Sequence, residues 1–475
     1  MNKIKTITSN IVSENILKIK DLFPNCVIEA KDKNDKITLK IDFETLKQEL
    51  SDDIIGENQE KYELTWPGKK ESILLANRPT DKILVPCKEE SVNWNTTQNL
   101  YIEGDNLDVL KILRRDYLNK IKLIYIDPPY NTGKNRLYKD KFTHSEWLNM
   151  MYPRLKLARD LLTDDGVIFI SIDDHEVHNI KNICNEVFGE ENFIGQMIHQ
   201  RAKGGGQAKH IVRGHDYILI YAKQLSSELT LKKKKIVQQK TYEINGKTCI
   251  KDDDVIRKAF GKYDKNLNDR RCFYEELLKY KGINKKNEVD QKIESGELFL
   301  EKNKFGMHTI CKYIPLDNAS SKLYSIITVM SEEGKSELEN INLPYFDYPK
   351  PINLIKQLVN AATFDSKDSI VLDFFSGSAT TAHAVMQLNA EDDGNRKFIM
   401  VQLPESCNEK SEAFKAGYKN ICEIGKERIR RAGKKIIEET GKTDLDVGFR
   451  VLKLDSSNMK ETHYLPEEYN SSFIT

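Results

Sequence analysis

The sequence predicts an α/β fold built on a mostly parallel sheet that is interrupted by an inserted domain. Short apolar runs at residues 100–102, 123–126 and 167–172 alternate with helical patterns, which is typical of strand–helix–strand units and a parallel sheet. This rhythm lapses beyond Lys223 and returns at about Tyr345. We therefore expect one α/β core that is split by an insertion.

Composition fits a large globular protein. The chain has 475 residues and 54.9 kDa, enough for about three domains or one large core with insertions. Its 39% hydrophobic content excludes a disordered chain, and its eight cysteines include no Cys-x-x-Cys pair, which argues against a disulfide scaffold or a zinc ribbon. No run approaches the ~18 apolar residues that span a bilayer. We expect a soluble cytoplasmic protein with no membrane partner.

The pattern along the chain predicts further elements. Residues 1–90 are polar and predict a small, mostly helical region with an amphipathic stretch at 11–22. Strands are expected at 193–198 and 217–221, and a helix begins near Pro351. The remaining elements of the second half are strands at 370–372 and 398–401 and one or two basic helices over 412–441. The predicted divisions are an N-terminal region, a first core segment, an inserted domain, a second core segment and a tail, at residues 1–90, 91–224, 225–344, 345–440 and 441–475.

The first motif with chemical content is Asp127-Pro128-Pro129-Tyr130, directly after an apolar strand, where ligands of open α/β sheets bind. The two prolines lack N–H donors, so the turn offers carbonyls beside the Asp127 carboxylate. Accepting both hydrogens of an aromatic amine such as adenine N6, with Asp127 and the Pro128 carbonyl, would leave the nitrogen lone pair free to attack. Tyr130 would stack on the base. The alternative is an ordinary Asp-Pro turn that ends a strand.

The second motif is the segment 373–381, again a strand, a tight turn and a helix. Its small residues let a ligand approach the backbone and the helix N-terminus. Ala379 stands where a glycine is common, so a close-packed turn without a ligand is an equal alternative. No Gly-Lys-Ser/Thr follows, which excludes a Walker A phosphate loop.

Together the two motifs resemble the amino-methyltransferases that use S-adenosylmethionine, and their order resembles the β group of DNA adenine-N6 methyltransferases. Longer blocks of sequence resemble the modification (Mod) subunits of type III restriction systems, namely residues 62–70, 99–106, 124–133, 203–210 and 371–389. The resemblance implies a class I methyltransferase fold, Rossmann-like and circularly permuted. It also implies that the insertion, residues 225–344, is a target-recognition domain.

The resemblance assigns roles to residues. It implies a catalytic turn made of Asp127, Pro128, Pro129 and Tyr130. It implies a cofactor site made of Asp105, Asp127, Pro128, Asp373, Phe375, Gly377, Ser378, Thr380 and Gln402, flanked by Lys350-Pro351 and 353–355. Gln402 departs from the family pattern, which often has an acid on the cofactor ribose there, and Glu405 is the alternative.

DNA contacts are expected from a local charge imbalance. The whole chain has 74 Lys and Arg against 73 Asp and Glu, a formal net charge of +1 that gives no hint of a polyanionic partner. Residues 195–250, however, hold eleven Lys and Arg against three acids, a net +8, whereas residues 171–194 carry a net −5. We expect a mobile basic arm that follows the phosphates, although any one lysine run is equally a solvated loop. The candidate DNA-binding residues are Lys203, Lys209, Arg213 and Lys134.

These features predict a site-specific, adenine-specific DNA methyltransferase that transfers a methyl group from S-adenosylmethionine to N6 of a flipped-out adenine in double-stranded DNA. No metal is expected, because His175 and His178 fit a helix surface. A restriction (Res) subunit and a second copy of the chain are partners implied by the family only, and Mod subunits typically extend further at the C-terminus. Two alternatives stay open, an N4-cytosine methyltransferase, which usually has Ser in place of Asp127, and a catalytically inactive DNA-binding specificity subunit.

Overall fold

The computed structural model describes residues 11–31, 37–50, 64–133, 140–204, 210–234, 240–259 and 269–456. The chain divides into two compact units. One unit is Met1–Thr230 together with Tyr324–Thr475, and the other is Leu231–Leu323. No helix in the described part of the chain is both long and apolar enough to cross a membrane.

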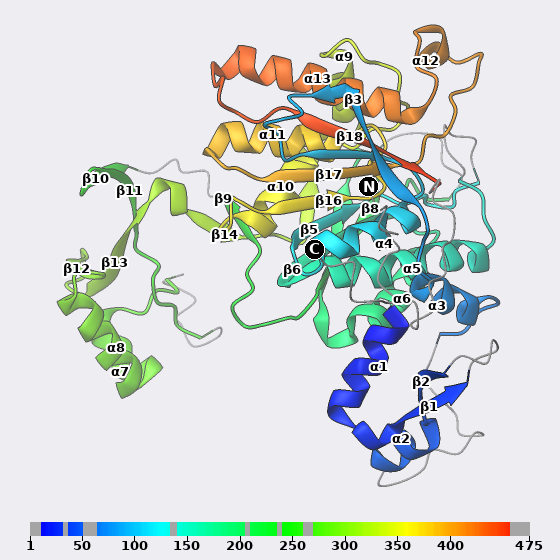
Figure 1. The fold of residues 1–475 in the computed structure, drawn as a ribbon. Coiled ribbons are helices and arrows are strands. Elements are labelled where there is room, and N and C mark those ends of the chain that lie inside the picture. The colour runs from blue at the N-terminus through cyan, green and yellow to red at the C-terminus, as the bar shows by residue number, and fades with distance from the viewer. Residues whose placement is uncertain are drawn as a thin grey trace, which may run out of the picture. The chain divides into compact units, whose positions relative to one another are not determined.

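A ten-stranded sheet forms the centre of the larger unit (Figure 1). From edge to edge its strands are β15 (Ile326–Thr328), β7 (Phe193–Gln200), β8 (His215–Ala222), β6 (Leu162–Ile172), β5 (Ile121–Ile126), β16 (Ile370–Asp373), β17 (Lys397–Gln402), β4 (Leu100–Glu103), β18 (Phe449–Asp455) and β3 (Ile83–Val92).

Strand direction within this sheet is mostly parallel, as predicted. The run β6, β5, β16, β17, β4 and β18 is parallel throughout, whereas β8 is antiparallel to both β6 and β7. The first and last strands of the central run come from distant segments of the chain, so the core is assembled from both sides of the insertion. The predicted Rossmann-like α/β core is confirmed.

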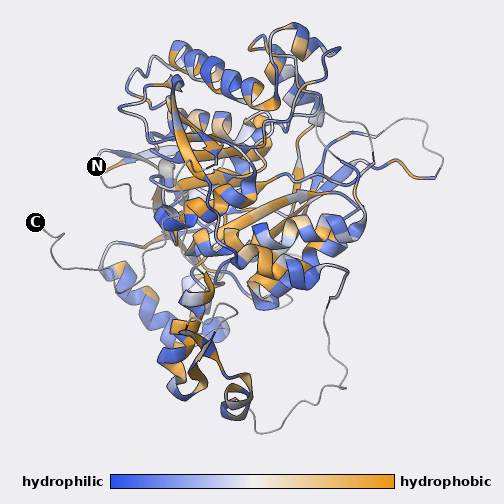
Figure 2. Cartoon of the chain, turned by 45° about the vertical axis from the view of Figure 1, so that its right-hand side comes forward, coloured by the Kyte–Doolittle hydropathy of each residue, from blue (hydrophilic) through white to orange (hydrophobic). Residues whose placement is uncertain are grey.

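Helices pack on this sheet in two groups. Helices α4 (Asn106–Tyr117), α5 (His144–Leu161) and α6 (Val177–Phe188) pack together, and their apolar residues share one core with alternate strand residues such as Ile124 and Ile126. Helices α10 (Ile352–Thr363), α11 (Thr380–Asp392) and α13 (Ile421–Thr440) form the second group, in which α10 contacts β5 and β6 and α11 contacts β17. Figure 2 shows the hydrophobic strands between helices whose outer faces are hydrophilic.

Two predictions about the ends of the chain were wrong. The described residues of the region 1–90 are only partly helical, because β1 (Val27–Lys31) and β2 (Ile37–Ile41) form an antiparallel pair among α1 (Ile11–Leu22), α2 (Phe43–Glu49) and α3 (Lys69–Asn77). The segment 441–475, expected to be a tail, contains β18, which lies between β4 and β3 in the sheet. Its burial depends on strands far away in sequence.

The smaller unit has its own sheet and core. Strands β10 (Thr241–Ile244), β11 (Lys247–Asp252), β13 (His308–Pro315) and β12 (Phe299–Lys302) are antiparallel neighbours in that order. Helices α7 (Leu277–Lys281) and α8 (Ile283–Glu294) contribute to a core that includes Leu277, Val289 and Ile310, and β9 (Lys232–Lys234) pairs with β14 (Ser320–Lys322).

This unit is narrower than the predicted insertion at 225–344. Beyond Leu323 the chain already belongs to the larger unit, because β15 pairs in parallel with β7. Helix α9 (Ser331–Glu339) follows in that same unit. The second half of the core therefore begins earlier than the pattern of apolar runs indicated.

Candidate active site

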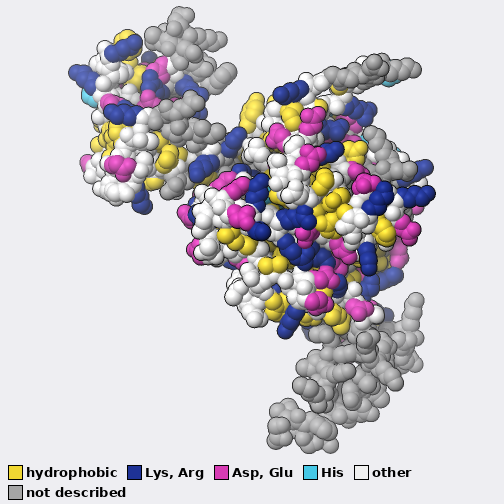
Figure 3. All heavy atoms as spheres, turned by 90° about the horizontal axis from the view of Figure 1, so that it is seen from above, with side chains coloured by type: hydrophobic (Ala, Val, Ile, Leu, Met, Phe, Trp, Pro, Cys, Tyr) yellow, Lys and Arg dark blue, Asp and Glu magenta, His cyan; other side chains and the backbone are white. Residues whose placement is uncertain are grey.

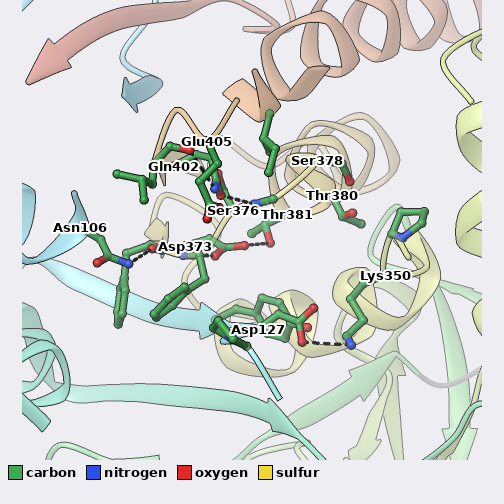
Figure 4. A pocket seen from close by; sticks show the side chains of 18 of the residues that line it. Asn106, Asp127, Lys350, Asp373, Ser376, Ser378, Thr380, Thr381, Gln402 and Glu405 are labelled. Atoms are coloured by element: carbon green, nitrogen blue, oxygen red, sulfur yellow. Dashed lines mark hydrogen bonds and ion pairs between the residues drawn. The ribbon is translucent and has the colours of Figure 1, made fainter. Parts of the chain in front are cut away.

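A pocket of about 280 Å³ opens at the carboxyl ends of the central strands (Figure 4). It lies there because β5 and β16 are parallel neighbours, so the loops that follow them leave the sheet at the same edge. The turn at Asp127 follows β5, and the loop that begins at Asp373 follows the end of β16. The two motifs singled out in the sequence thus meet in one pocket.

Asp127 and Tyr130 share a single cation. The Nζ atom of Lys350 lies 3.0 Å from Oδ1 of Asp127 and donates a hydrogen bond of 2.7 Å to the Tyr130 hydroxyl. The same ammonium lies 4.8 Å from the centre of the Tyr130 ring, within the range of a cation–π contact. Burial, and secondarily the charge of Asp127, raise the pKa of Tyr130, so its hydroxyl stays protonated. Lys350 thereby joins the Asp127 turn to the start of α10.

Helix α5 holds the Asp127–Tyr130 turn in place through a hydrogen bond. Trp147 is fully buried, and its Nε1 donates a hydrogen bond of 2.8 Å to the Pro129 carbonyl. Beyond the turn, Asn131 adopts a left-handed backbone with φ of 62°, and its amide nitrogen donates to Asp140 Oδ1 at 2.8 Å. The Asn131 side chain also donates to the buried Glu176. These bonds hold the backbone on both sides of Tyr130.

Asp373 is buried, and its pKa is raised above the ordinary value of an aspartate. Thr381 donates a hydrogen bond of 2.6 Å to one of its oxygens, and the Phe375 amide donates one of 3.1 Å to the other. Burial nevertheless dominates and raises the pKa of Asp373 to about 7, with a further contribution from the charge of Asp127. Asp373 therefore changes charge near neutral pH.

The loop after Asp373 needs two left-handed residues. Gly377 has φ of 50°, and a Cβ atom there would lie 3.3 Å from Cζ of Phe346. Ala379 has φ of 62° at the N-cap of α11. A glycine would adopt this conformation without strain, which explains why glycine is common at that position. The loop is tightened further by Gln402, whose Oε1 accepts the Gly377 amide hydrogen at 2.7 Å.

Asp105, which follows β4, also lines the pocket. It caps α4 by accepting the Leu107 amide hydrogen at 2.8 Å, and it pairs with Arg154 at 3.0 Å. Arg154 also donates to Asn106, whose amide group donates to the Phe374 carbonyl at 2.7 Å. This network ties the start of α4, α5 and the second motif together around the pocket.

Most of the residues predicted for the site meet at this pocket. Asp105, Asp127, Pro129, Asp373, Phe375, Gly377, Ser378, Thr380 and Gln402 line it. Pro128 and Tyr130 are not in the lining, although Tyr130 is joined to it through Lys350. Glu405 also lines the pocket, so both residues considered for the cofactor ribose lie at it.

Sequence reasoning missed other members of this site. Asn106, Phe346 and Arg154 line the pocket without having been singled out, and Lys350 was expected only to flank the cofactor. Arg154 looks like any charged residue on a helix, and its position is set by packing that one sequence does not reveal.

Of the predicted DNA-binding residues, only Lys203 and Arg213 are described. Lys203 is exposed, Arg213 is exposed and pairs with Asp174 at 3.5 Å, and neither lines the pocket. Lys134 and Lys209 lie outside the described residues. Because Arg213 belongs to the basic stretch and Asp174 to the acidic one, the two stretches meet in space. Figure 3 shows Lys and Arg side chains interspersed with Asp and Glu on the visible face of the larger unit.

The histidines considered for a metal, His175 and His178, follow the end of β6. His175 pairs with Asp173 at 2.9 Å, and within the described ranges no group of three or more His, Cys, Asp or Glu side chains is arranged to hold a metal ion.

The sequence model of the family described as DNA methylase (N6_N4_Mtase) matches residues 121–432, more than half of the chain. The chain belongs to this DNA methylase family. The match spans both motifs and the insertion between them. It confirms the prediction of a DNA methyltransferase at the level of the family, and with it the class I methyltransferase fold.

Three relatives show where in this family the chain lies. It is 34% identical to the type III restriction-modification enzyme StyLTI Mod subunit of Salmonella typhimurium, over 83% of this chain and 66% of that protein. It is 32% identical to the EcoP15I Mod subunit of Escherichia coli, over 84% of this chain and 72% of that protein. The type II methyltransferase M.KpnI of Klebsiella pneumoniae is 32% identical over 70% of this chain and 87% of its own length. The predicted resemblance to Mod subunits is confirmed, and the chain spans about two thirds of the length of the first of them.

Proposed function

We propose that this chain is a site-specific DNA methyltransferase that transfers a methyl group from S-adenosylmethionine to N6 of adenine in double-stranded DNA. The supporting observation is that the Asp127 turn and the Asp373 loop leave neighbouring parallel strands and line one pocket. The acceptors of the Asp127 turn, which suit an aromatic amine, thus share a pocket with the Asp373 loop, which suits a small charged ligand.

The pocket residues fit S-adenosylmethionine. Asp105 and Glu405 supply carboxylates for hydroxyl and amine donors, and Phe375 and Leu403 supply apolar surface for an adenine ring. Gly377 lets the backbone approach a ligand, since a Cβ atom there would crowd Phe346. When bound, the cofactor supplies an electrophilic methyl group on a sulfonium.

The chain's own residues would act on the target amine. Asp127 and the Pro128 carbonyl accept the two N6 hydrogens, which directs the nitrogen lone pair toward the methyl donor. Tyr130 lies against the base, and the proton released after transfer passes to Asp127 or to water. Because N6 is paired inside a duplex, the adenine must leave the stack to reach this pocket, at a cost of a few kcal/mol.

DNA recognition falls to two regions of the chain. We assign phosphate contacts to the basic stretch 195–250, with Lys203, Lys209 and Arg213 as candidates, and to Lys134 outside it. We assign base recognition to the compact unit Leu231–Leu323, because it folds around its own core and interrupts the methyltransferase core.

The relatives support a restriction-modification role. Two of them are named as Mod subunits, so we propose that this chain is the modification component of such a system and pairs with a restriction subunit, with dimerisation as a further proposal. A methyltransferase that acts without a restriction subunit is the second candidate, favoured by the similarity to M.KpnI over 87% of that protein.

Sequencing of native DNA tests this proposal in cells. The full chain and Asp127→Ala are expressed in a host that lacks its own DNA methyltransferases, and modified bases are read by single-molecule sequencing. We expect N6-methyladenine in one short motif with the wild type and none with the variant. Methylation that persists in the variant would place the active site elsewhere.

A further inference from the structure

Arg428 of α13 is a fully buried cation behind the pocket loop. Its Nη1 atom donates hydrogen bonds of 2.8 Å to Ser378 Oγ and 2.6 Å to Thr380 Oγ1. Among the described residues its Nε and Nη2 atoms have no hydrogen-bond partner, and no carboxylate lies within ion-pair distance. Burial lowers the pKa of Arg428 to about 10, which still leaves it charged at neutral pH. The charge of Glu337 favours the guanidinium without forming an ion pair with it, so a further anion nearby would stabilise this costly buried charge.

The two hydroxyls transmit this charge to the pocket. A guanidinium can only donate hydrogen bonds, so Ser378 and Thr380 must both accept from Arg428. Their own hydrogens are then free to point elsewhere, and neither hydroxyl donates to an acceptor within the described part of the chain. Both side chains line the pocket although they are only 3% and 6% exposed (Figure 4).

The same region of the pocket lies at the start of a helix. Helix α11 begins at Thr380, and its N-cap residue Ala379 has no side chain that could accept from the first amide groups. Free amide hydrogens and the helix dipole both favour a negative group here. Two oriented hydroxyls, a buried cation and a helix N-terminus thus favour one kind of ligand group, an anion.

We propose that Arg428 is a positioning residue that holds the carboxylate of the cofactor's amino-acid end, acting through the Ser378 and Thr380 hydroxyls. The inference rests on the proposed use of S-adenosylmethionine, whose only anionic group is that carboxylate. Arg428 adds a positive charge to this site from behind the loop 373–381, without contacting the ligand itself.

Calorimetric titration of the full chain with two ligands tests this. S-adenosylhomocysteine carries the carboxylate, whereas 5′-methylthioadenosine keeps the nucleoside and the sulfur and lacks the amino-acid end. For Arg428→Met we expect the Kd of S-adenosylhomocysteine to rise about tenfold or more, the scale of a charge-assisted bond, and that of methylthioadenosine to change less than twofold. Arg428→Lys should recover some of the loss. Lys435→Met, on the same helix and half exposed, should leave both ligands unchanged.

A second variant covers the case in which Arg428→Met does not fold. Thr380→Val keeps the guanidinium and removes one hydroxyl, and it should weaken S-adenosylhomocysteine selectively, by a smaller factor. Equal weakening of both ligands, or no change in either, would overturn the inference. Failure of the wild type to bind either ligand would instead overturn the proposed cofactor.

Discussion

Lys350 Nζ lies 3.0 Å from Asp127 Oδ1, so an ammonium group contacts the carboxylate that should receive the hydrogens of the target amine. The side chains are 16% and 26% exposed, so water screens this pair only partially. The ammonium weakens this carboxylate as an acceptor for a second donor. We therefore expect the target base to displace Lys350 when it enters.

The first prediction concerns this displacement. Lys350→Met removes the competing ammonium, so the flipped state of the target adenine should become more populated, by about fivefold for a pair worth ~1 kcal/mol. The thymine left behind reports this through its reactivity with permanganate. Lys356→Met, which breaks an exposed pair with Glu391, is the control and should change nothing. Lower thymine reactivity in Lys350→Met would show that Lys350 stabilises the flipped adenine and does not compete with it.

The second prediction concerns the pH dependence of stability through Asp373. Its folded-state pKa, about 7, lies above the ordinary aspartate value near 3.8, so between those values the folded protein binds a proton that the unfolded chain does not. Stability from this group is therefore present at low pH and is lost as pH rises through 7. Thermal unfolding of the wild type and Asp373→Asn from pH 5 to 8 should show the wild type losing Tm relative to the variant. A constant difference would contradict the assigned titration.

The third prediction concerns the support of the catalytic turn. Trp147→Phe removes the N–H that bonds the Pro129 carbonyl, so we expect kcat to fall about tenfold or more and unfolding free energy to fall by about 1 to 3 kcal/mol. Trp66→Phe is matched, because Trp66 is also buried and its Nε1 donates to Asn149 at 2.7 Å away from the pocket lining. It should lose similar stability and keep kcat. Equal loss of kcat in both variants would show that the hydrogen bond from Trp147 to Pro129 has no specific effect on catalysis.

The fourth prediction concerns the cofactor ribose. Glu405 lines the pocket and carries a carboxylate, the group that binds a pair of hydroxyls, so we assign the ribose hydroxyls to it. Glu405→Ala should weaken S-adenosylhomocysteine by about tenfold and bind its 2′,3′-dideoxy analogue as the wild type does. If Glu405→Ala still prefers S-adenosylhomocysteine over the dideoxy analogue as strongly as the wild type does, a residue other than Glu405 binds the ribose.

The sequence predicted the elements of this site well because a strand followed by a turn is recognised from local patterns. The runs that end at Asp127 and at Asp373 are apolar and short, and both are followed by turn residues that bind ligands at the edge of a sheet. Their adjacency, β5 beside β16, is a finding of the structure, since two strands of one parallel sheet need not be neighbours. The left-handed backbone of Ala379 could not be read in advance, since alanine gives no local signal for it.

The contacts that complete the site depend on packing between distant segments. Lys350 and Asp127 are more than two hundred residues apart, and Arg428 reaches Thr380 only because α13 packs on α11. Strand β18 was missed for the same reason, because its partners β4 and β3 precede it by more than three hundred residues. Neither composition nor periodicity encodes such pairings.

Nucleoside analysis of methylated DNA tests the central claim most directly. The purified chain is incubated with double-stranded host DNA and S-adenosylmethionine that carries a labelled methyl group, the DNA is digested to nucleosides, and the labelled products are separated by mass. We predict labelled N6-methyldeoxyadenosine as the product, with no label incorporated by Asp127→Ala. Label found only in N4-methyldeoxycytidine would contradict the proposed target base, and no label from the wild type would indicate a DNA-binding subunit without catalysis.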